Sequence, residues 1–86
     1  MHREYIVSNF YKFLKLNNID ETKIKLKNKL KGLDIKGSFL IGNEGVNGSF
    51  SVKNHDFKRT VSIINSVFDE KFKFKSQFYH SHVFLR

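Results

Sequence analysis

The chain contains no cysteine and no proline, and it has only eight acidic residues against sixteen lysine and arginine residues. The absence of cysteine excludes disulfides, thiolate metal sites and a cysteine nucleophile within these residues. No apolar run approaches the roughly 20 residues that a membrane-spanning helix needs, and the N-terminus lacks the apolar core of a signal peptide. These absences predict a soluble, cytoplasmic protein with no membrane partner.

Size and aromatic content determine what core the chain can form. Its 86 residues are enough for a single domain, which we expect to span residues 1–86. Such a chain buries only about 60 to 65 per cent of its unfolded surface, which predicts modest stability. Ten phenylalanines partly offset this, because each large aromatic side chain removes about 150 to 250 Å² from water. A packed globule is therefore favoured over a disordered tail.

The formal net charge is +8, and the basic residues are spread along the chain instead of being held in one tail. A field of this sign attracts polyanions, so nucleic acid is the first partner to consider. Lysines on solvated faces need no partner, however, and charge alone does not identify a particular nucleic acid. The charge favours nucleic-acid binding without specifying it.

The segment from residue 23 to 31 has two interpretations. Lysine at every second position is, taken alone, typical of an amphipathic strand. Leu26 and Leu30 also fall at helical spacing, Asp20 is placed to cap a helix N-terminus, and Gly32 suits a helix C-terminus. We favour the helix.

The other elements have clearer patterns. Residues 5–16 are rich in Tyr, Ile, Val and Phe at both parities, which predicts a central strand with both faces largely covered. A helix is predicted after Asn54 as N-cap, and a last strand begins at Phe72 and continues or restarts over residues 83–86. The stripe that predicts this second helix consists of Phe57, Val61, Ile64 and Phe68.

Between these segments lies the most informative stretch, a predicted hairpin. Its strands are residues 35–41 and 46–52, and its loop contains an Asn-Gly pair that adopts positive φ at little energetic cost. We expect Asn43, Glu44 and Asn47 to lie at the mouth of this hairpin, where a rigid sheet presents them to a ligand.

The element order is β-α-β-β-α-β, with no linker or repeat. This order predicts an α+β, ferredoxin-like sandwich in which a four-stranded antiparallel sheet has both helices on one face. RNA recognition motifs share the order, but the third strand here has one aromatic residue, Phe50, where that module carries several. Acylphosphatases also share it, but residues 16–20 lack the arginine-containing phosphate loop that their activity requires.

Few residues suggest catalysis or metal binding. Glu44 is the one carboxylate in a glycine-rich, apolar neighbourhood, where it acts either as a base or as an acceptor of backbone N–H bonds that fixes the loop. His80 and His82 would share one face of a strand, but no third ligand at suitable spacing accompanies them. We therefore expect no metal and no cofactor, and assign no catalytic residue.

Taken together, Phe10-Tyr-Lys-Phe13, the spacing to Lys36-Gly37 and the string Leu40-Ile-Gly-Asn-Glu-Gly-Val-Asn-Gly48 resemble a known family. They are similar to the N-terminal acylphosphatase-like domain of the rhodanese-like tRNA uridine hydroxylases. Proteins of that family 5-hydroxylate the wobble uridine of tRNA with oxygen, and a rhodanese domain with a conserved cysteine follows this region. The resemblance implies a tRNA-related role. The rhodanese domain of that family, with its conserved cysteine, is absent from this chain.

Our leading hypothesis is a domain that positions tRNA for the rhodanese catalytic domain. One rival is a structural module that docks the rhodanese domain through Tyr5, Tyr11 and Phe13 without touching RNA, and another is a stand-alone RNA-binding domain. A further alternative places Glu44 and Asn47 in an active site completed across the domain boundary. Lys23, Lys27 and Lys31 share one face of the predicted first helix. The candidate RNA contacts are Lys12, Lys36, Asn43, Glu44, Gly45, Asn47, Gly48 and Arg86.

Overall fold

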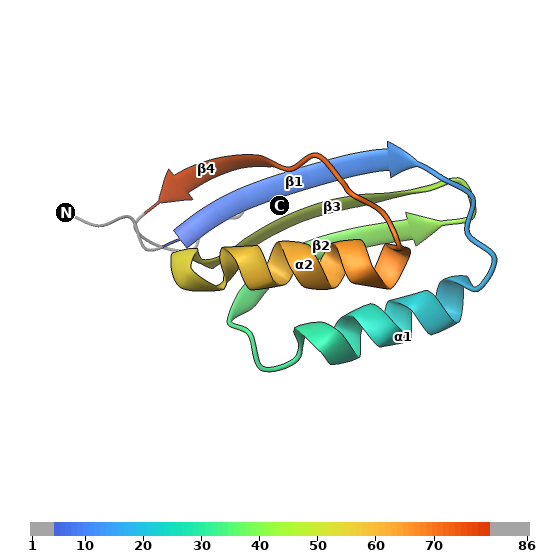
Figure 1. The fold of residues 1–86 in the computed structure, drawn as a ribbon, viewed down its shortest axis with the longest axis horizontal. Coiled ribbons are helices and arrows are strands. Elements are labelled where there is room, and N and C mark those ends of the chain that lie inside the picture. Colours follow the sequence, from blue (N-terminus) through green and yellow to red (C-terminus); the bar gives the residue numbers. More distant parts are fainter. Residues whose placement is uncertain (1–4, 80–86) are drawn as a thin grey trace.

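The computed structural model describes residues 5–79, which form one antiparallel sheet in the order β2-β3-β1-β4. Both helices lie on the same side of the sheet, as Figure 1 shows. This arrangement confirms the predicted α+β, ferredoxin-like sandwich. The elements are β1 (Tyr5–Phe13), α1 (Ile19–Leu30), β2 (Ile35–Gly42), β3 (Gly45–Lys53), the 3₁₀ helix η1 (Asn54–Asp56), α2 (Phe57–Phe68) and β4 (Lys75–Tyr79).

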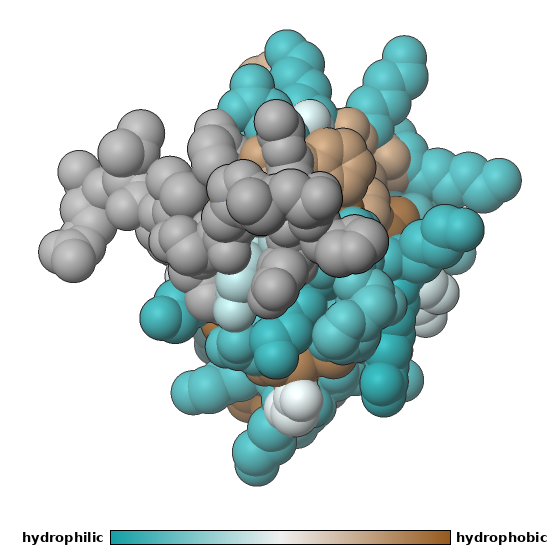
Figure 2. Space-filling view, turned by 90° about the vertical axis from the view of Figure 1, so that its left-hand side faces the viewer, coloured by the Kyte–Doolittle hydropathy of each residue, from teal (hydrophilic) through white to brown (hydrophobic). Residues whose placement is uncertain are grey.

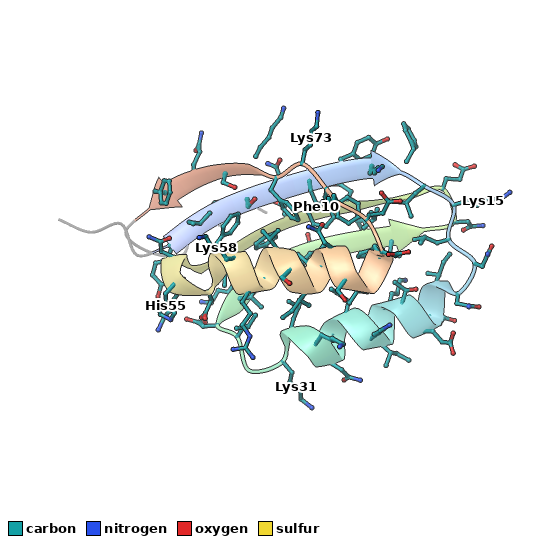
Figure 3. All side chains as sticks on the ribbon, viewed as in Figure 1. Phe10, Lys15, Lys31, His55, Lys58 and Lys73 are labelled. Carbon is teal, nitrogen blue, oxygen red and sulfur yellow. The ribbon has the colours of Figure 1, made fainter. Side chains whose placement is uncertain are left out.

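Phenylalanine rings dominate the core between the sheet and the helices. Phe10 lies in this layer (Figure 3), and its ring centroid is 4.7 Å from that of Phe72 and 5.0 Å from that of Phe74. Phe50 is fully buried beside this group. The aromatic content therefore supplies the core that a chain of this length needs.

The β2–β3 hairpin is tighter than the sequence predicted. Gly42 pairs with Gly45, so the turn consists of Asn43 and Glu44 alone, while Asn47 and Gly48 lie within β3. A Cβ atom at Gly48 would lie 2.7 Å from Cδ1 of Phe39 and 2.8 Å from Cζ of Phe10. The predicted strand bounds of 46–52 correctly included Asn47 and Gly48, whereas the assignment of this Asn-Gly pair to the loop was wrong. Gly48 is needed because two rings pack over it.

The sheet face opposite the helices is exposed around Tyr11 and Phe13, near the end of the first strand, which corrects the prediction for this strand. Along β1, Ile6, Ser8 and Phe10 are buried toward the helices, whereas Tyr11 and Phe13 are exposed on the opposite face. With both helices on one side, no described element covers the other. The strand also ends at Phe13 and not at residue 16.

Helix α1 is confirmed, although its cap differs from the prediction. Leu26 and Leu30 are buried, as their spacing indicated. The helix begins one residue before Asp20 with Asn18 as N-cap, so Asp20 lies in the first turn, where its charge favours the helix dipole. Gly32 follows the helix with a φ of 95°, in line with its predicted role at the C-terminus.

Helix α2 is also confirmed, with two differences. Asn54 begins the 3₁₀ turn η1, and Asp56 takes the N-cap position of α2. Thr60, rather than Val61, is buried with Ile64 and Phe68, and its hydroxyl donates to the Asp56 carbonyl over 2.8 Å. A threonine is compatible with the core once its hydroxyl is hydrogen-bonded.

The last strand starts three residues later than predicted. The backbone N–H of Phe72 donates to Oδ1 of Asn65 over 3.0 Å, and the Phe72 and Phe74 side chains pack into the core before β4 begins at Lys75. The predicted continuation over residues 83–86 lies outside the described residues. Neither helix within residues 5–79 has the length and apolar character needed to cross a membrane.

Candidate nucleic-acid interface

The β2–β3 turn is held against the chain that follows β1. The N–H of Leu14 donates to the Glu44 carbonyl, and the N–H of Leu16 donates to the Asn43 carbonyl, both over 3.2 Å. Within residues 5–79 the Glu44 carboxylate forms no hydrogen bond or ion pair, so the backbone of Glu44, not its side chain, anchors the loop. The carboxylate is exposed at the end of the sheet.

Beside this turn lies a shallow hollow of about 400 Å³, which we call the turn hollow. Leu40, Asn47 and Tyr11 occupy one row across β2, β3 and β1, and Phe13 lies in the next row with Gly42 and Gly45. The rings of Tyr11 and Phe13 meet edge to face, with centroids 5.1 Å apart. Its lining comprises Tyr11, Phe13, Leu40, Gly42, Glu44, Gly45 and Asn47 on the open face and at the turn, and Lys23, Phe39, Ile41 and Val46 on the helix side of the sheet.

A second depression, the α1–β2 groove, adjoins the turn hollow. Its volume is about 190 Å³, and it runs between helix α1 and the edge strand β2. Lys23 and Lys27 line it from the helix, and Gly37 and Ser38 line it from the strand. Lys23 borders both depressions, so a lysine stands where the groove meets the turn hollow.

The structure brings some of the predicted site residues together. Glu44, Gly45 and Asn47 line the turn hollow, and Asn43 is exposed in the turn beside them. Gly48 is buried beneath the Phe10 and Phe39 rings, so it presents no surface to a ligand.

The predicted basic contacts are dispersed. Lys12 shares the helix-side parity of Phe10, and its Nζ pairs with the Glu70 carboxylate over 2.5 Å. Lys36 is exposed on the open face of β2, four residues before Leu40 and hence about 13 Å from it along the strand. Arg86 lies outside the described residues.

Other lysines point away from the molecule on different sides. Lys15, Lys31 and Lys73 project from the loop after β1, the end of α1 and the segment before β4 (Figure 3). The end of the molecule opposite the turn is also mostly hydrophilic over its described part (Figure 2). The positive charge is therefore spread over the surface. Two lysines, Lys23 and Lys27, line the α1–β2 groove, where no acidic residue of the described part of the chain accompanies them. Lys58 and Lys71, in contrast, line a depression beside α2 together with Asp69 and Glu70.

The described part of the chain holds no cluster of three or more metal-ligating His, Cys, Asp or Glu side chains. His55 is exposed, with Nε2 3.5 Å from a carboxylate oxygen of the neighbouring Asp56. His80 and His82 lie outside the described residues, so the structure does not place them.

Several residues that line the turn hollow were not among the predicted RNA contacts, although Tyr11 and Phe13 were predicted as a docking face and Lys23 as part of a lysine face on the first helix. These lining residues are Tyr11, Phe13, Lys23, Phe39, Leu40, Ile41, Gly42 and Val46. Phe13 and Tyr11 have the parity opposite to the buried Phe10, which is a usable signal once one sheet face is taken as open. Leu40 and Lys23 come from separate elements, and only the folded structure shows that they border one hollow.

The strand order and the two helices on one face place the chain in the class of α+β domains with ferredoxin-like topology, which acylphosphatases share. Comparison with known proteins gives the family within this class. The chain belongs to the UPF0176 acylphosphatase-like domain family, whose sequence profile matches residues 5–86. The resemblance seen in the strand and hairpin motifs is thereby confirmed.

Several curated relatives carry the name tRNA uridine(34) hydroxylase. The protein of Pelagibacter ubique is 41% identical over 71 residues, which make up 83% of this chain and 23% of that protein. The protein of Wigglesworthia glossinidia brevipalpis is 38% identical over 61 residues, covering 71% of this chain and 19% of the relative. The protein of Legionella pneumophila (strain Corby) is 35% identical over 49 residues, covering 57% of this chain and 19% of the relative. The chain thus spans about a fifth of these relatives' length.

Proposed function

We propose that this domain contacts tRNA and positions it for a tRNA wobble-uridine hydroxylase, acting in the cytoplasm as an accessory domain of the modification reaction. The relatives are named for uridine 34, the first nucleotide of the anticodon, and this chain matches only about a fifth of them. The hydroxylation chemistry then belongs to a rhodanese catalytic domain, on the same or a separate chain, and substrate contact belongs to this one.

The observation that carries the proposal is the pair of lysines in the α1–β2 groove. Lys23 and Lys27 lie four residues apart on α1, a spacing that puts both on one helix face, and both line the groove beside β2. Two ammonium groups along one depression suit successive phosphates of a nucleic-acid backbone. Because Lys23 also borders the turn hollow, the exposed Asn43, Glu44 and Asn47 are within the same contact region.

A matched pair of double variants tests this assignment. Lys23→Gln/Lys27→Gln and Lys25→Gln/Lys29→Gln each remove two charges from exposed positions of α1, but Lys25 and Lys29 do not line the groove. The measurement is the affinity for tRNA at several salt concentrations, by fluorescence anisotropy. Loss of two phosphate contacts reduces the slope of log K against log salt by about 1.4 to 1.8.

We expect the salt slope to fall by this amount for Lys23→Gln/Lys27→Gln. The control, Lys25→Gln/Lys29→Gln, should change the slope clearly less. Equal slopes for the two double variants would show that only total charge matters, and would remove the groove from the contact region. No tRNA binding by the parent domain, even at low salt, would refute the proposal as a whole.

The second candidate function is docking of the rhodanese domain without RNA contact. The exposure of 74% at Phe13 and 69% at Leu40 favours it, since a large apolar surface typifies protein interfaces as well as ligand sites. In that case the separately expressed rhodanese domain of a relative binds this chain with little salt dependence, and tRNA does not bind. A stand-alone RNA-binding domain would bind tRNA and show no affinity for the rhodanese domain.

A further inference from the structure

Tyr11 and Phe13 form an exposed aromatic pair that the fold itself does not require. Tyr11 is 59% exposed and Phe13 is 74% exposed, both on the sheet face that no described element covers. Their rings contact each other at 73°, so each restricts the movement of the other. Leu40, two strands away in the same row as Tyr11, adds a third exposed apolar side chain. Exposed apolar side chains grouped in this way are typical of a binding site.

The row of the sheet that contains Phe13 is otherwise bare. Phe13 pairs with Gly45, and Gly45 pairs with Gly42, so two of the three residues in this row lack a side chain. A Cβ atom at Gly42 would meet nothing within 4 Å, which shows that the space above it is open. A Cβ atom at Gly45 would instead lie 2.7 Å from the Lys12 carbonyl oxygen, so the open space of this row is above Gly42, where a flat ligand ring can lie. The volume of about 400 Å³ lies at the lower end of the range for small-molecule pockets.

Polar and charged groups at the border suit a nucleotide. Asn47 lies between Leu40 and Tyr11 in their row, and its amide supplies both donors and an acceptor for the edge of a base. Lys23 stands where the hollow meets the α1–β2 groove, in position for the phosphate that joins such a base to its neighbour. The net charge of +8 attracts an anionic ligand to this surface rather than an uncharged one.

We propose that the turn hollow binds one unpaired base of the RNA, which stacks on Phe13 next to the Tyr11 ring, with its edge at Asn47. This inference rests on the proposed contact with tRNA and makes it specific: the sheet selects a single-stranded loop over a duplex. Duplex bases are stacked on their neighbours and offer no free face, whereas loop bases can turn outward onto aromatic side chains.

The test compares three replacements of Phe13 in the full 86-residue chain. Phe13→Ala removes the ring, Phe13→Leu keeps an apolar side chain without a π-face, and Phe13→Trp keeps a larger π-face. The probes are a 17-nucleotide tRNA anticodon stem-loop and a blunt duplex of the same stem. Stacking on an aromatic side chain corresponds to about 5- to 150-fold in affinity. We expect the alanine and leucine variants to bind the stem-loop at least about 5-fold more weakly than the parent. The tryptophan variant should retain parental affinity.

A fluorescence signal and a matched control variant help to interpret the result. The chain contains no tryptophan, so Phe13→Trp also introduces a single fluorophore, and we expect its emission to fall when the stem-loop binds. Ile24→Ala is the matched control, because Ile24 is 61% exposed but lies on α1 outside the turn hollow. We expect this control to bind both probes as the parent does.

The outcomes separate this inference from the proposed function. If the parent binds no RNA, the proposed function fails and the base site with it. If the parent binds RNA but Phe13→Ala or Phe13→Leu binds the stem-loop equally well, tRNA contact stands and the stacking site is refuted. Equal parental affinity for stem-loop and duplex also refutes it. A parent that is dimeric by sedimentation, with a monomeric Phe13→Ala variant, would assign the hollow to a second copy of the chain instead.

Discussion

Replacing Gly48 by alanine is expected to lower the free energy of unfolding by about 1 to 2 kcal/mol, because the added methyl group enters a closed part of the core. Its Cβ would lie 2.7 Å from Cδ1 of Phe39 and 2.8 Å from Cζ of Phe10. Phe10 is 3% exposed and is packed against Phe72 and Phe74, so its ring has nowhere to move. Atoms this close force side chains or backbone to shift.

The magnitude follows from two opposing effects. Inserting a methylene-sized group into a packed core destabilises a protein by about 1 to 3 kcal/mol. Removing a glycine from the unfolded chain restricts its conformations and offsets about 0.4 to 1 kcal/mol of that loss. For a domain of this size, each kcal/mol moves the melting temperature by about 4 to 8 °C. Thermal and urea unfolding followed by circular dichroism measure both quantities, and we expect a lower melting temperature with an unchanged urea m-value.

Gly42→Ala is the matched control, since a Cβ there meets nothing within 4 Å and Gly42 also lies in a strand of the same hairpin. We expect it to be neutral or slightly stabilising. A second comparison uses Phe10→Leu, which removes the ring atoms that crowd Gly48. The effect of Gly48→Ala should be smaller in that background, as expected for residues in contact. An unchanged or increased stability of Gly48→Ala alone would refute the packing argument, and an undiminished loss beside Phe10→Leu would point to a backbone requirement instead.

Three further predictions concern the junctions between elements. Asn65→Ala should lower the unfolding free energy by about 1 kcal/mol in urea unfolding, because the Phe72 N–H loses its acceptor, while Asn65→Asp keeps that acceptor and most of the stability; equal stability of the two variants would contradict this. Asp69 has a φ of 53°, so Asp69→Gly should raise the melting temperature and Asp69→Val should lower it, and the reverse order would exclude strain at this cap. Ser8→Ala should lower the unfolding free energy by about 0.5 to 1.5 kcal/mol by removing the 2.9 Å bond to Ser76 between β1 and β4, and the effect should shrink when Ser76→Ala is already present.

Periodicity predicted the helices well because burial of a helix face is a local pattern. In α1, lysine alternation suggested a strand, but the spacing of Leu26 and Leu30 correctly predicted a helix. In α2, the buried side also includes Thr60, which hydropathy alone does not select. Its hydrogen bond to Asp56 makes it acceptable in the core, and such a bond is visible only in the folded chain.

The candidate site was harder to predict, because it depends on how layers and strands combine. The richness of residues 5–16 in apolar side chains suggested coverage on both faces, yet the two helices cover one face and leave Tyr11 and Phe13 exposed. The Asn-Gly pair was expected in a turn, but the pairing of Gly42 with Gly45 puts Gly48 beneath the aromatic core. Strand register is set by long-range pairing, so a local motif could not determine it.

The arrangement of lysines on α1 limits how much of the net charge one ligand can use. Lys23 and Lys27 line the groove, whereas residues two positions away on a helix, such as Lys25, point about 200° away from them. Lysine at every second position therefore divides the charge between two sides of the helix, with Lys23, Lys27 and Lys31 on one side and Lys25 and Lys29 on the other. A single RNA strand in the groove contacts about half of these lysines at most, so the salt slope of binding should reflect a few contacts and stay well below the value that all of the basic residues together would give.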